Sequence, residues 1–237
     1  MDSEIQVFPP HGFVRLTDWM GTELDIVNAA RVSFHKESEW QVDSEKIFSL
    51  DDPDAGLIRF LLKNRHGTPF EQGFQSMWHI RMPIFVMREW VRHRIGHSVN
   101  EESGRYVKMR PDFYVPDYVR TQVGKPGGYT FEPADPEVTD KAQRAIRSNS
   151  AYAWAAYEEM LDAGVAREVA RQVLPLNLYT EMRWTANARS LMHFIGLRAH
   201  PDAMYEIRKY AEAIEELFAY HMPTTYAAFV EAGRVAP

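Results

Sequence analysis

The segment FQSMWHIRM, residues 74–82, gives the clearest indication of fold class in this 237-residue chain, because its side chains alternate with a period of two. One face of the segment would carry mostly apolar side chains, namely Phe74, Ser76, Trp78, Ile80 and Met82. The opposite face would carry Gln75, Met77, His79 and Arg81. This alternation is typical of a β-strand that turns one face toward a hydrophobic core.

The flanking sequence predicts further strands early in the chain and helices late. Residues 13–19 (FVRLTDW) read as a second strand, and Thr22 is placed to cap a helix that carries Leu24, Val27 and Ala30. Helical patterns then cover 54–67, 83–94, 138–163, 166–173, 187–197, 202–220 and 224–231. Other strands are predicted at 104–109 and 178–185, and a loop rich in Gly and Pro at 121–136. We therefore expect an α+β fold in a single domain, residues 1–237.

Composition narrows the class of protein. The chain has no cysteine, which excludes disulfides, thiolate metal sites and thiol nucleophiles. No apolar run approaches the roughly 18 residues of a membrane span, and the first residues lack the pattern of a signal peptide. We expect a soluble, cytoplasmic protein with no membrane partner.

The charge of the chain is unevenly distributed. The net charge is −6, so no nucleic-acid partner is expected for the chain as a whole. Residues 81–120, however, hold eight basic and five acidic side chains, a local charge of +3 that leaves −9 elsewhere. Such a basic centre suggests a small bound anion, and the alternative is a solvated basic surface.

The densest group of functional side chains is RHRIGHSVNEESGR, residues 92–105. Arginine is suited to bidentate phosphate recognition, and Ser103, Gly104 and Arg105 add a hydroxyl, an open backbone and another guanidinium. We interpret the stretch as a ligand site rather than a basic surface loop. It also permits a zinc site, because His93, His97 and Glu101 would line one helix face, although Gly96 weakens a continuous helix.

Two other groups are weaker signals. One comprises Arg167, Arg171, Arg183, Asn187, Arg189 and Arg198, in which Asn187 suits the N-cap of a phosphate-attracting helix. Arginines at helix ends are more often paired with acids. The other is HGTPFEQ, residues 66–72, where Thr68 and Glu71 resemble a capping box.

Taken together, these segments resemble the flavin-dependent thymidylate synthase (ThyX) family. The family signature is Arg-His-Arg followed by a serine, and here Arg92-His93-Arg94 precedes Ser103 with eight residues between. The accompanying family segments occur in order as AARVSF (29–34), HGTPFE (66–71), PIFVMREWVRHR (83–94), REVARQVLPLNLYT (167–180) and NARSLMHFIGLRA (187–199). The resemblance runs from about residue 12 to 231 and implies helices packed on an antiparallel sheet.

The resemblance also implies an activity and its ligands. The family makes dTMP from dUMP, with 5,10-methylenetetrahydrofolate as carbon donor and FAD, reduced by NADPH, as hydride source. The active form resembles a homotetramer whose sites are shared between subunits. Positions that match dUMP contacts are Glu89, Arg92, Glu101, Ser103, Gly104, Arg105, Arg171 and Arg198. Positions that match flavin contacts are Ser33, Thr68, Glu71, Arg92, His93, Arg94, Asn100, Glu101, Asn187, Arg189 and His193, and His66 matches a position near the folate.

The residues constrain how such a reaction proceeds. A protein thiolate cannot activate the uracil ring, because there is no cysteine. Ser103 has no evident base beside it, so we give it a binding role. Arg198 matches the family arginine that stabilises negative charge on the pyrimidine, an electrostatic role, and it is the expected catalytic residue.

The chain departs from the family pattern at three places. Glu89 stands where glutamine is common, His193 stands where asparagine is common, and residues 36–50 form an extra stretch. Two other classes of function remain open from the residues alone: a metal hydrolase built on His93, His97 and Glu101, and a nucleotide-binding module without turnover. A flavin absorbance spectrum would decide against both.

Overall fold

The computed structural model describes residues 3–45, 48–125 and 128–237. The chain folds as two units. Unit 1 comprises Met1–Met82, Val86–Glu101 and Glu181–Pro237, and unit 2 comprises Pro83–Phe85 and Glu102–Thr180.

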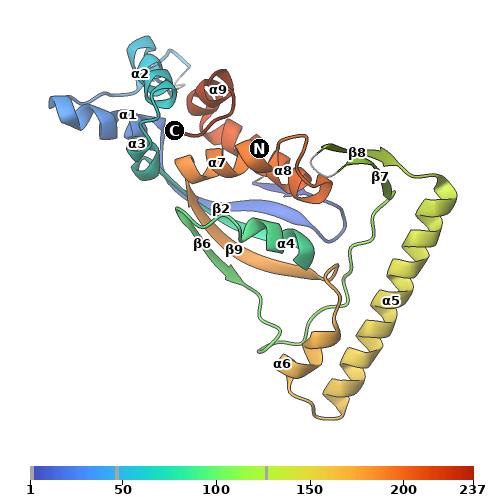
Figure 1. Cartoon of the computed structure of the whole chain (residues 1–237). Helices are drawn as coiled ribbons and strands as arrows, with labels where there is room; N and C mark the ends of the chain where they lie inside the picture. Colours follow the sequence, from blue (N-terminus) through green and yellow to red (C-terminus); the bar gives the residue numbers. More distant parts are fainter. Residues whose placement is uncertain (1–2, 46–47, 126–127) are drawn as a thin grey trace. The chain divides into compact units, whose positions relative to one another are not determined.

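Unit 1 is built on a five-stranded sheet (Figure 1). In spatial order its strands are β1 (Glu4–Gln6), β2 (Phe13–Gly21), β5 (Phe74–Pro83), β9 (Tyr179–Asn187) and β6 (His97–Glu101). The pairs β1–β2, β2–β5 and β6–β9 are antiparallel. The predicted strands at 13–19, 74–82 and 178–185 are therefore confirmed, whereas β1 and β6 were not predicted.

Strand β5 has the two faces that its sequence predicts. Trp78, Ile80 and Met82 are buried, while Met77 on the opposite face is 45% exposed. The one polar side chain on the core face, Ser76, is satisfied, because its Oγ donates to Ala186 O at 2.8 Å and accepts from Trp78 Nε1 at 2.8 Å. A buried hydroxyl with both partners costs little, so the strand remains compatible with an apolar core.

Helices of unit 1 supply the rest of its core. They are α1 (Glu23–Arg31), α2 (Asp52–Lys63), α3 (Thr68–Gln72), α4 (Ile84–Trp90), α7 (Ala188–Arg198), α8 (Tyr205–His221) and α9 (Pro223–Glu231). Helix α8 contacts α7, α9 and strand β2. Trp90 at the end of α4 packs edge-on against Trp184 of β9 and beside Phe194 of α7. Two helices and one strand of the sheet are thereby joined at one aromatic cluster.

Several predicted helix boundaries in unit 1 are wrong, and two of them have a clear local cause. Helix α2 begins at Asp52 rather than at Asp54, because Asp51 is the N-cap and its Oδ1 accepts from Asp54 N at 2.8 Å. Helix α4 ends at Trp90 rather than near Arg94, because the chain turns there, with His93 N donating to Trp90 O at 3.0 Å.

The extra stretch at 36–50 contains the short antiparallel pair β3 (Gln41–Val42) and β4 (Phe48–Ser49), and residues 46 and 47 lie outside the described part. Its beginning is fixed to α1 and α2. Ser38 exchanges hydrogen bonds with the Asn28 side chain, and its Oγ donates to Asp54 Oδ1 at 3.0 Å. Asp54 is buried and also pairs with Arg31. The stretch is therefore part of the α1–α2 packing.

Unit 2 contains the hairpin β7 (Arg120–Lys125) and β8 (Gly128–Pro133), the long helix α5 (Pro136–Asp162), the short helix α6 (Arg167–Ala170) and the 3₁₀ turn η2 (Arg171–Val173) (Figure 1). Its small core is formed by Met109, Tyr157, Ala170 and Leu178. The loop predicted at 121–136 is wrong for its described residues, which pair as a hairpin and then begin α5; residues 126 and 127 lie outside them.

The strand predicted at 104–109 is also wrong. Ser103 O accepts from both Tyr106 N, at 2.9 Å, and Val107 N, at 3.2 Å, which closes a turn in place of an extended segment. Among the residues that the structure describes, no helix has the length and apolar character needed to cross a membrane.

Candidate active site

The turn that follows α4 carries the arginine-rich stretch. Gly96 in this turn has a φ of +69°, and a Cβ there would lie 2.2 Å from the Ser190 Oγ of α7. That Oγ donates to Ile95 O at 3.0 Å. Only glycine combines this backbone conformation with so close an approach. The turn is therefore held directly against the first turn of α7.

The start of α7 brings three of the predicted flavin contacts together: Asn187, Arg189 and, on α3, Glu71. Asn187 is the N-cap, as the sequence predicts, and its Oδ1 accepts from Ser190 N at 2.8 Å. Arg189 Nη1 pairs with the Glu71 carboxylate of α3, and Arg189 Nε donates to Pro237 O at 2.6 Å. Helix α7 thus presents its N-terminal end, which favours anions, beside a held guanidinium.

The last turn of α7 holds Arg198 against the end of α4 and the turn after it. Arg198 Nη1 donates to Glu89 Oε2 at 3.0 Å, and Nη2 donates to Glu89 O at 3.1 Å. Arg198 Nε donates to His93 Nε2 at 2.9 Å. These three hydrogen bonds fix the guanidinium, and the Arg198 side chain keeps 20% of its surface exposed.

His93 and His97 are both held in the neutral form. Burial lowers the pKa of His93 to about 4, with smaller contributions from Arg198, His97 and His193. Burial also lowers the pKa of His97 to about 4, and His193 adds to the effect. Trp184 Nε1 donates to His97 Nδ1 at 3.0 Å, and the two rings are stacked. Taking a charged ring out of water is unfavourable, so both imidazoles are acceptors near neutral pH.

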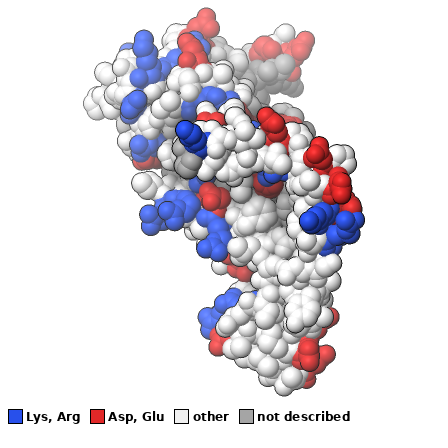
Figure 2. Space-filling model, turned by 45° about the vertical axis from the view of Figure 1, so that its right-hand side comes forward, with Lys and Arg blue, Asp and Glu red and all other residues white. Residues whose placement is uncertain are grey.

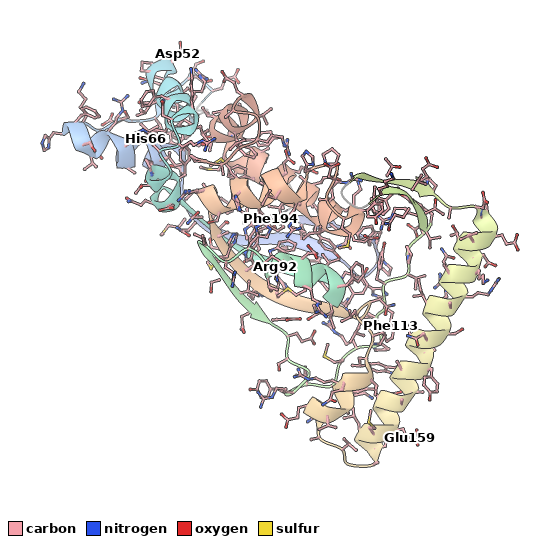
Figure 3. All side chains as sticks on the ribbon, viewed as in Figure 1. Asp52, His66, Arg92, Phe113, Glu159 and Phe194 are labelled. Carbon is pink, nitrogen blue, oxygen red and sulfur yellow. The ribbon has the colours of Figure 1, made fainter. Side chains whose placement is uncertain are left out.

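The other predicted flavin contacts lie at the surface of unit 1. They are Ser33 in the 3₁₀ turn η1 (Val32–Phe34), Thr68 in α3, Arg92 and Arg94 in the turn after α4, Asn100 and Glu101 in β6, and His193 in α7. Within the described residues, Arg92 and Arg94 make neither a hydrogen bond nor an ion pair. In Figure 3 Arg92 is labelled just past α4, and Phe194 on α7.

His66, the predicted folate-proximal residue, is exposed between α2 and α3 (Figure 3). Its ring lies 5.9 Å from that of Phe60 on α2, measured between centroids. Thr68 is the first residue of α3, whose N-cap is Gly67, so the capping box predicted for Thr68 is wrong.

In unit 2, Ser103, Gly104, Arg105 and Arg171 form a second cluster. Gly104 is buried, and a Cβ there would lie 3.2 Å from Arg171 Cδ and 3.1 Å from Met109 Sδ. Arg105 Nε donates to Glu168 Oε2 at 3.1 Å, in an exposed ion pair. The Ser103 hydroxyl accepts a long contact of 3.4 Å from Arg105 N. No base contacts this hydroxyl in the described part of unit 2.

The helix-face geometry proposed for zinc is wrong. His97 and Glu101 are the two ends of strand β6, and His93 belongs to the preceding turn. Nowhere in the described ranges do three His, Asp or Glu side chains gather so as to hold a metal ion.

Two features of unit 1 were not expected from sequence. The first is the contact of Arg198 with both Glu89 and His93, which are more than a hundred positions away in the chain. Spacing carries no signal for such a contact. The second is a groove of about 590 Å³ between α2 and α9, which contains none of the predicted site residues. Its lining is Arg59, Phe60, Leu62, Lys63, Arg65, Ala228, Glu231, Ala232 and Val235.

Basic side chains on the surface form separate groups and not one continuous patch. Figure 2 shows Lys and Arg side chains in several groups on the face drawn, with Asp and Glu side chains interspersed. This pattern agrees with a net charge of −6 and suits a small anion better than an extended polyanion.

Fold and site together define an α+β protein with an arginine-rich site at both ends of one helix. The chain belongs to the family described as "Thymidylate synthase complementing protein", whose model matches residues 15–224. It is 45% identical over 235 residues to a flavin-dependent thymidylate synthase of Streptomyces coelicolor, a match that covers 94% of this chain and 93% of that protein. It is also 45% identical over 220 residues to a protein of the same name from Thermotoga neapolitana, with 93% and 91% covered.

A solved structure supports the same fold class. The UMP/dUMP methylase PolB from Streptomyces cacaoi, bound with 5-Br dUMP, matches with a TM-score of 0.83 and 39% identity, covering 94% of this chain and 97% of that one. The predicted family and the predicted α+β fold on an antiparallel sheet are confirmed.

Proposed function

We propose that this protein makes dTMP from dUMP by reductive methylation. The observation that carries the proposal is the 45% identity, over 94% of the chain, to a protein named flavin-dependent thymidylate synthase. We further propose 5,10-methylenetetrahydrofolate as the carbon donor and NADPH-reduced FAD as the hydride source. The absence of cysteine supports this route, because it removes the thiol nucleophile that would otherwise activate the ring.

The residues of unit 1 fit an FAD site. The turn after α4 offers Arg92 and Arg94, two exposed guanidinium groups without partners among the described residues, and a guanidinium suits a diphosphate. The N-terminal end of α7 lies against this turn through Gly96 and Ser190. When bound, FAD would supply the hydride. The residues proposed to hold it are Ser33, Thr68, Glu71, Arg92, His93, Arg94, Asn100, Glu101, Asn187, Arg189 and His193, with His66 near the folate.

The residues proposed to contact dUMP are those that the family resemblance implies. In unit 1 they are Glu89, Arg92, Glu101 and Arg198, and in unit 2 they are Ser103, Gly104, Arg105 and Arg171. Arginine forks and a hydroxyl suit the phosphate, and the absence of a side chain at Gly104 leaves room for Arg171, whose Cδ would lie 3.2 Å from a Cβ there.

Arg198 is the proposed catalytic residue. A guanidinium can stabilise negative charge that develops on the uracil ring. Its position is already fixed by Glu89 and His93, so little reorganisation is needed when substrate binds. A fixed hydrogen-bond donor stabilises the developing charge better than a mobile one, because the donor does not have to reorient during the reaction.

We also propose a cytoplasmic homotetramer with sites shared between subunits. The proposal follows the family resemblance, and it accounts for predicted dUMP contacts that occur in widely separated segments. Light scattering of the purified protein would give the mass of the assembly against 27.5 kDa for one chain.

An absorbance spectrum combined with one variant tests the function. Purified protein should be yellow with a flavin spectrum, and Arg198→Ala should keep the flavin and lose most dTMP synthesis. Arg198→Lys should not restore activity, because a point charge does not reproduce the planar fork. A colourless protein that binds dUMP without turnover would instead be a nucleotide-binding module.

UMP methylation is the second candidate function, because the structural relative PolB is described as a UMP/dUMP methylase. The assay is therefore run with dUMP and with UMP. A larger kcat/KM for UMP would replace the proposed substrate and leave the proposed chemistry intact.

A further inference from the structure

The hydrogen bonds of Arg198 leave a defined part of its guanidinium free. A guanidinium carries five N–H bonds. In the described part of the chain, Arg198 uses one on Nε toward His93, one on Nη1 toward the Glu89 carboxylate and one on Nη2 toward the Glu89 carbonyl. Two N–H bonds remain, one on each terminal nitrogen. Each can donate to an acceptor atom of a bound ligand.

The contact with His93 requires a particular form of the imidazole. Because Arg198 Nε donates, His93 Nε2 must be unprotonated, and the ring proton of the neutral imidazole is on Nδ1. His93 is only 8% exposed. The charged or titratable groups around it are Arg198 and His193 on α7 and His97 on β6, with ring centroids 5.7 Å and 6.0 Å away for the two histidines. None of these supplies a negative charge that would favour a protonated ring.

A neutral acceptor differs from an acidic one in its effect on Arg198. Glu89 already places one carboxylate 3.0 Å from Nη1, and that carboxylate is 44% exposed, so solvent weakens its field. A second carboxylate in the buried position of His93 would cancel more of the guanidinium charge. An imidazole nitrogen fixes the direction of Nε and leaves the charge available to a ligand.

From this geometry we infer that His93 is a positioning residue for Arg198: its neutral ring accepts the Nε–H and aims the two free N–H bonds at the substrate. This inference rests on the proposed function, in which Arg198 acts on the uracil. It differs from the flavin contact that the family resemblance implies for His93, because the effect passes through Arg198. It follows that another side chain can replace the His93 ring if it places a neutral acceptor within hydrogen-bond distance of Arg198 Nε. An apolar side chain cannot replace it.

The test compares His93→Gln, which supplies a neutral oxygen acceptor, with His93→Leu, which supplies none. His93→Leu should lower kcat by roughly 10- to 100-fold, the worth of a hydrogen bond to a charged group, with less than about a threefold change in the KM for dUMP. His93→Gln should recover at least about tenfold of that loss. Equal kcat values for the two variants, or a loss confined to flavin binding, would overturn the inference.

A second measurement is independent of activity. In a crystal structure of His93→Gln the Arg198 fork should stay in place, with the introduced amide oxygen as acceptor, whereas in His93→Leu the fork should be displaced from Glu89. His97→Leu is the matched control, since it removes a neighbouring ring that does not contact Arg198. An Arg198 fork that stays in place in His93→Leu overturns the positioning role even if the wild-type protein makes no dTMP, and absent turnover in the wild type counts against the proposed function alone.

Discussion

Among single residues, the site arginines differ in whether protein groups hold them before a ligand binds. Arg92 is exposed and has no partner in the part of the chain that the structure describes, whereas Arg189 and Arg198 are each held by several acceptors. A free guanidinium on a conformationally fixed turn is available to an anion and contributes little to stability without one.

Arg92→Ala should therefore weaken dUMP binding by about 1.5–3 kcal/mol, the usual worth of a charge-assisted hydrogen bond. The melting temperature of the ligand-free protein should change little. Calorimetric titration and thermal unfolding measure the two quantities, and Arg59→Ala, an exposed arginine on α2, is the matched control. A large fall in melting temperature with unchanged dUMP affinity would show that Arg92 is structural.

Ser103 illustrates the same distinction for a hydroxyl. Its carbonyl closes the turn at 103–107, which alanine preserves, and its Oγ has only a long contact with Arg105 N. Ser103→Ala should keep measurable dTMP formation and raise the KM for dUMP by roughly tenfold, as expected for one lost hydrogen bond to substrate. Complete inactivity at saturating dUMP, with an adduct of 5-fluoro-dUMP on Ser103 in the intact-protein mass, would instead indicate covalent catalysis.

Between elements, the turn after α4, which carries Arg92 and Arg94, contacts the start of α7, which carries Asn187 and Arg189. Gly96→Ala should lower the melting temperature and weaken FAD binding, because its Cβ would meet Ser190 Oγ at 2.2 Å. Gly164→Ala is the control: Gly164 also has a positive φ, of +81°, but its Cβ would have open space.

The control should show only the backbone cost of a left-handed alanine, about 1–2 kcal/mol, and unchanged flavin affinity. Flavin fluorescence during titration and thermal unfolding follow both variants. Equal losses of melting temperature and of flavin affinity in Gly96→Ala and Gly164→Ala would mean that the close approach of Gly96 to Ser190 does not matter for the site.

Elements with a buried face were predictable, and those without one were not. Strand β5 alternates because one face meets the core, so its pattern is visible in the sequence. Hairpin β7–β8 is exposed along nearly its whole length, so no buried face imposes a hydrophobic pattern on its sequence. Strand β6 is polar and is formed by backbone pairing with β9, which local sequence does not reveal.

Some features of the candidate site were likewise predictable from the sequence, and others were not. The residue types, and the N-cap at Asn187, follow from motifs and local chemistry. The pairings Arg189–Glu71 and Arg198–His93 do not, because they join residues more than a hundred positions apart. Tertiary packing determines such contacts, and it also decided that α4 stops at Trp90 and frees Arg92 from a helix.

For the molecule as a whole, the two buried histidines make stability depend on pH. In the unfolded chain His93 and His97 titrate near 6.5, and in the folded protein the pKa of each is lowered to about 4. Between these values the unfolded state binds more protons, so the free energy of unfolding falls as the pH is lowered from 6.5 toward 4. Well above this window the contribution is constant. Burial raises the pKa of Glu23, which acts in the opposite direction.

Thermal unfolding at about pH 7 and about pH 5 should therefore show a lower melting temperature at the lower pH. The double variant His93→Gln, His97→Gln keeps both acceptors but cannot titrate there, so its melting temperature should change less between the two pH values. The same dependence in both proteins would assign the effect to other groups.

The proposed reaction requires that this chain form dTMP by flavin chemistry and without a thiol. The decisive measurement is chromatographic detection of dTMP formed from dUMP by purified protein with 5,10-methylenetetrahydrofolate and NADPH, before and after removal of bound FAD. We expect dTMP with the holoprotein, none after FAD is removed, and recovery when FAD is added back. Formation of dTMP by flavin-free protein, or no dTMP from protein carrying FAD and all substrates, would contradict the proposed reaction.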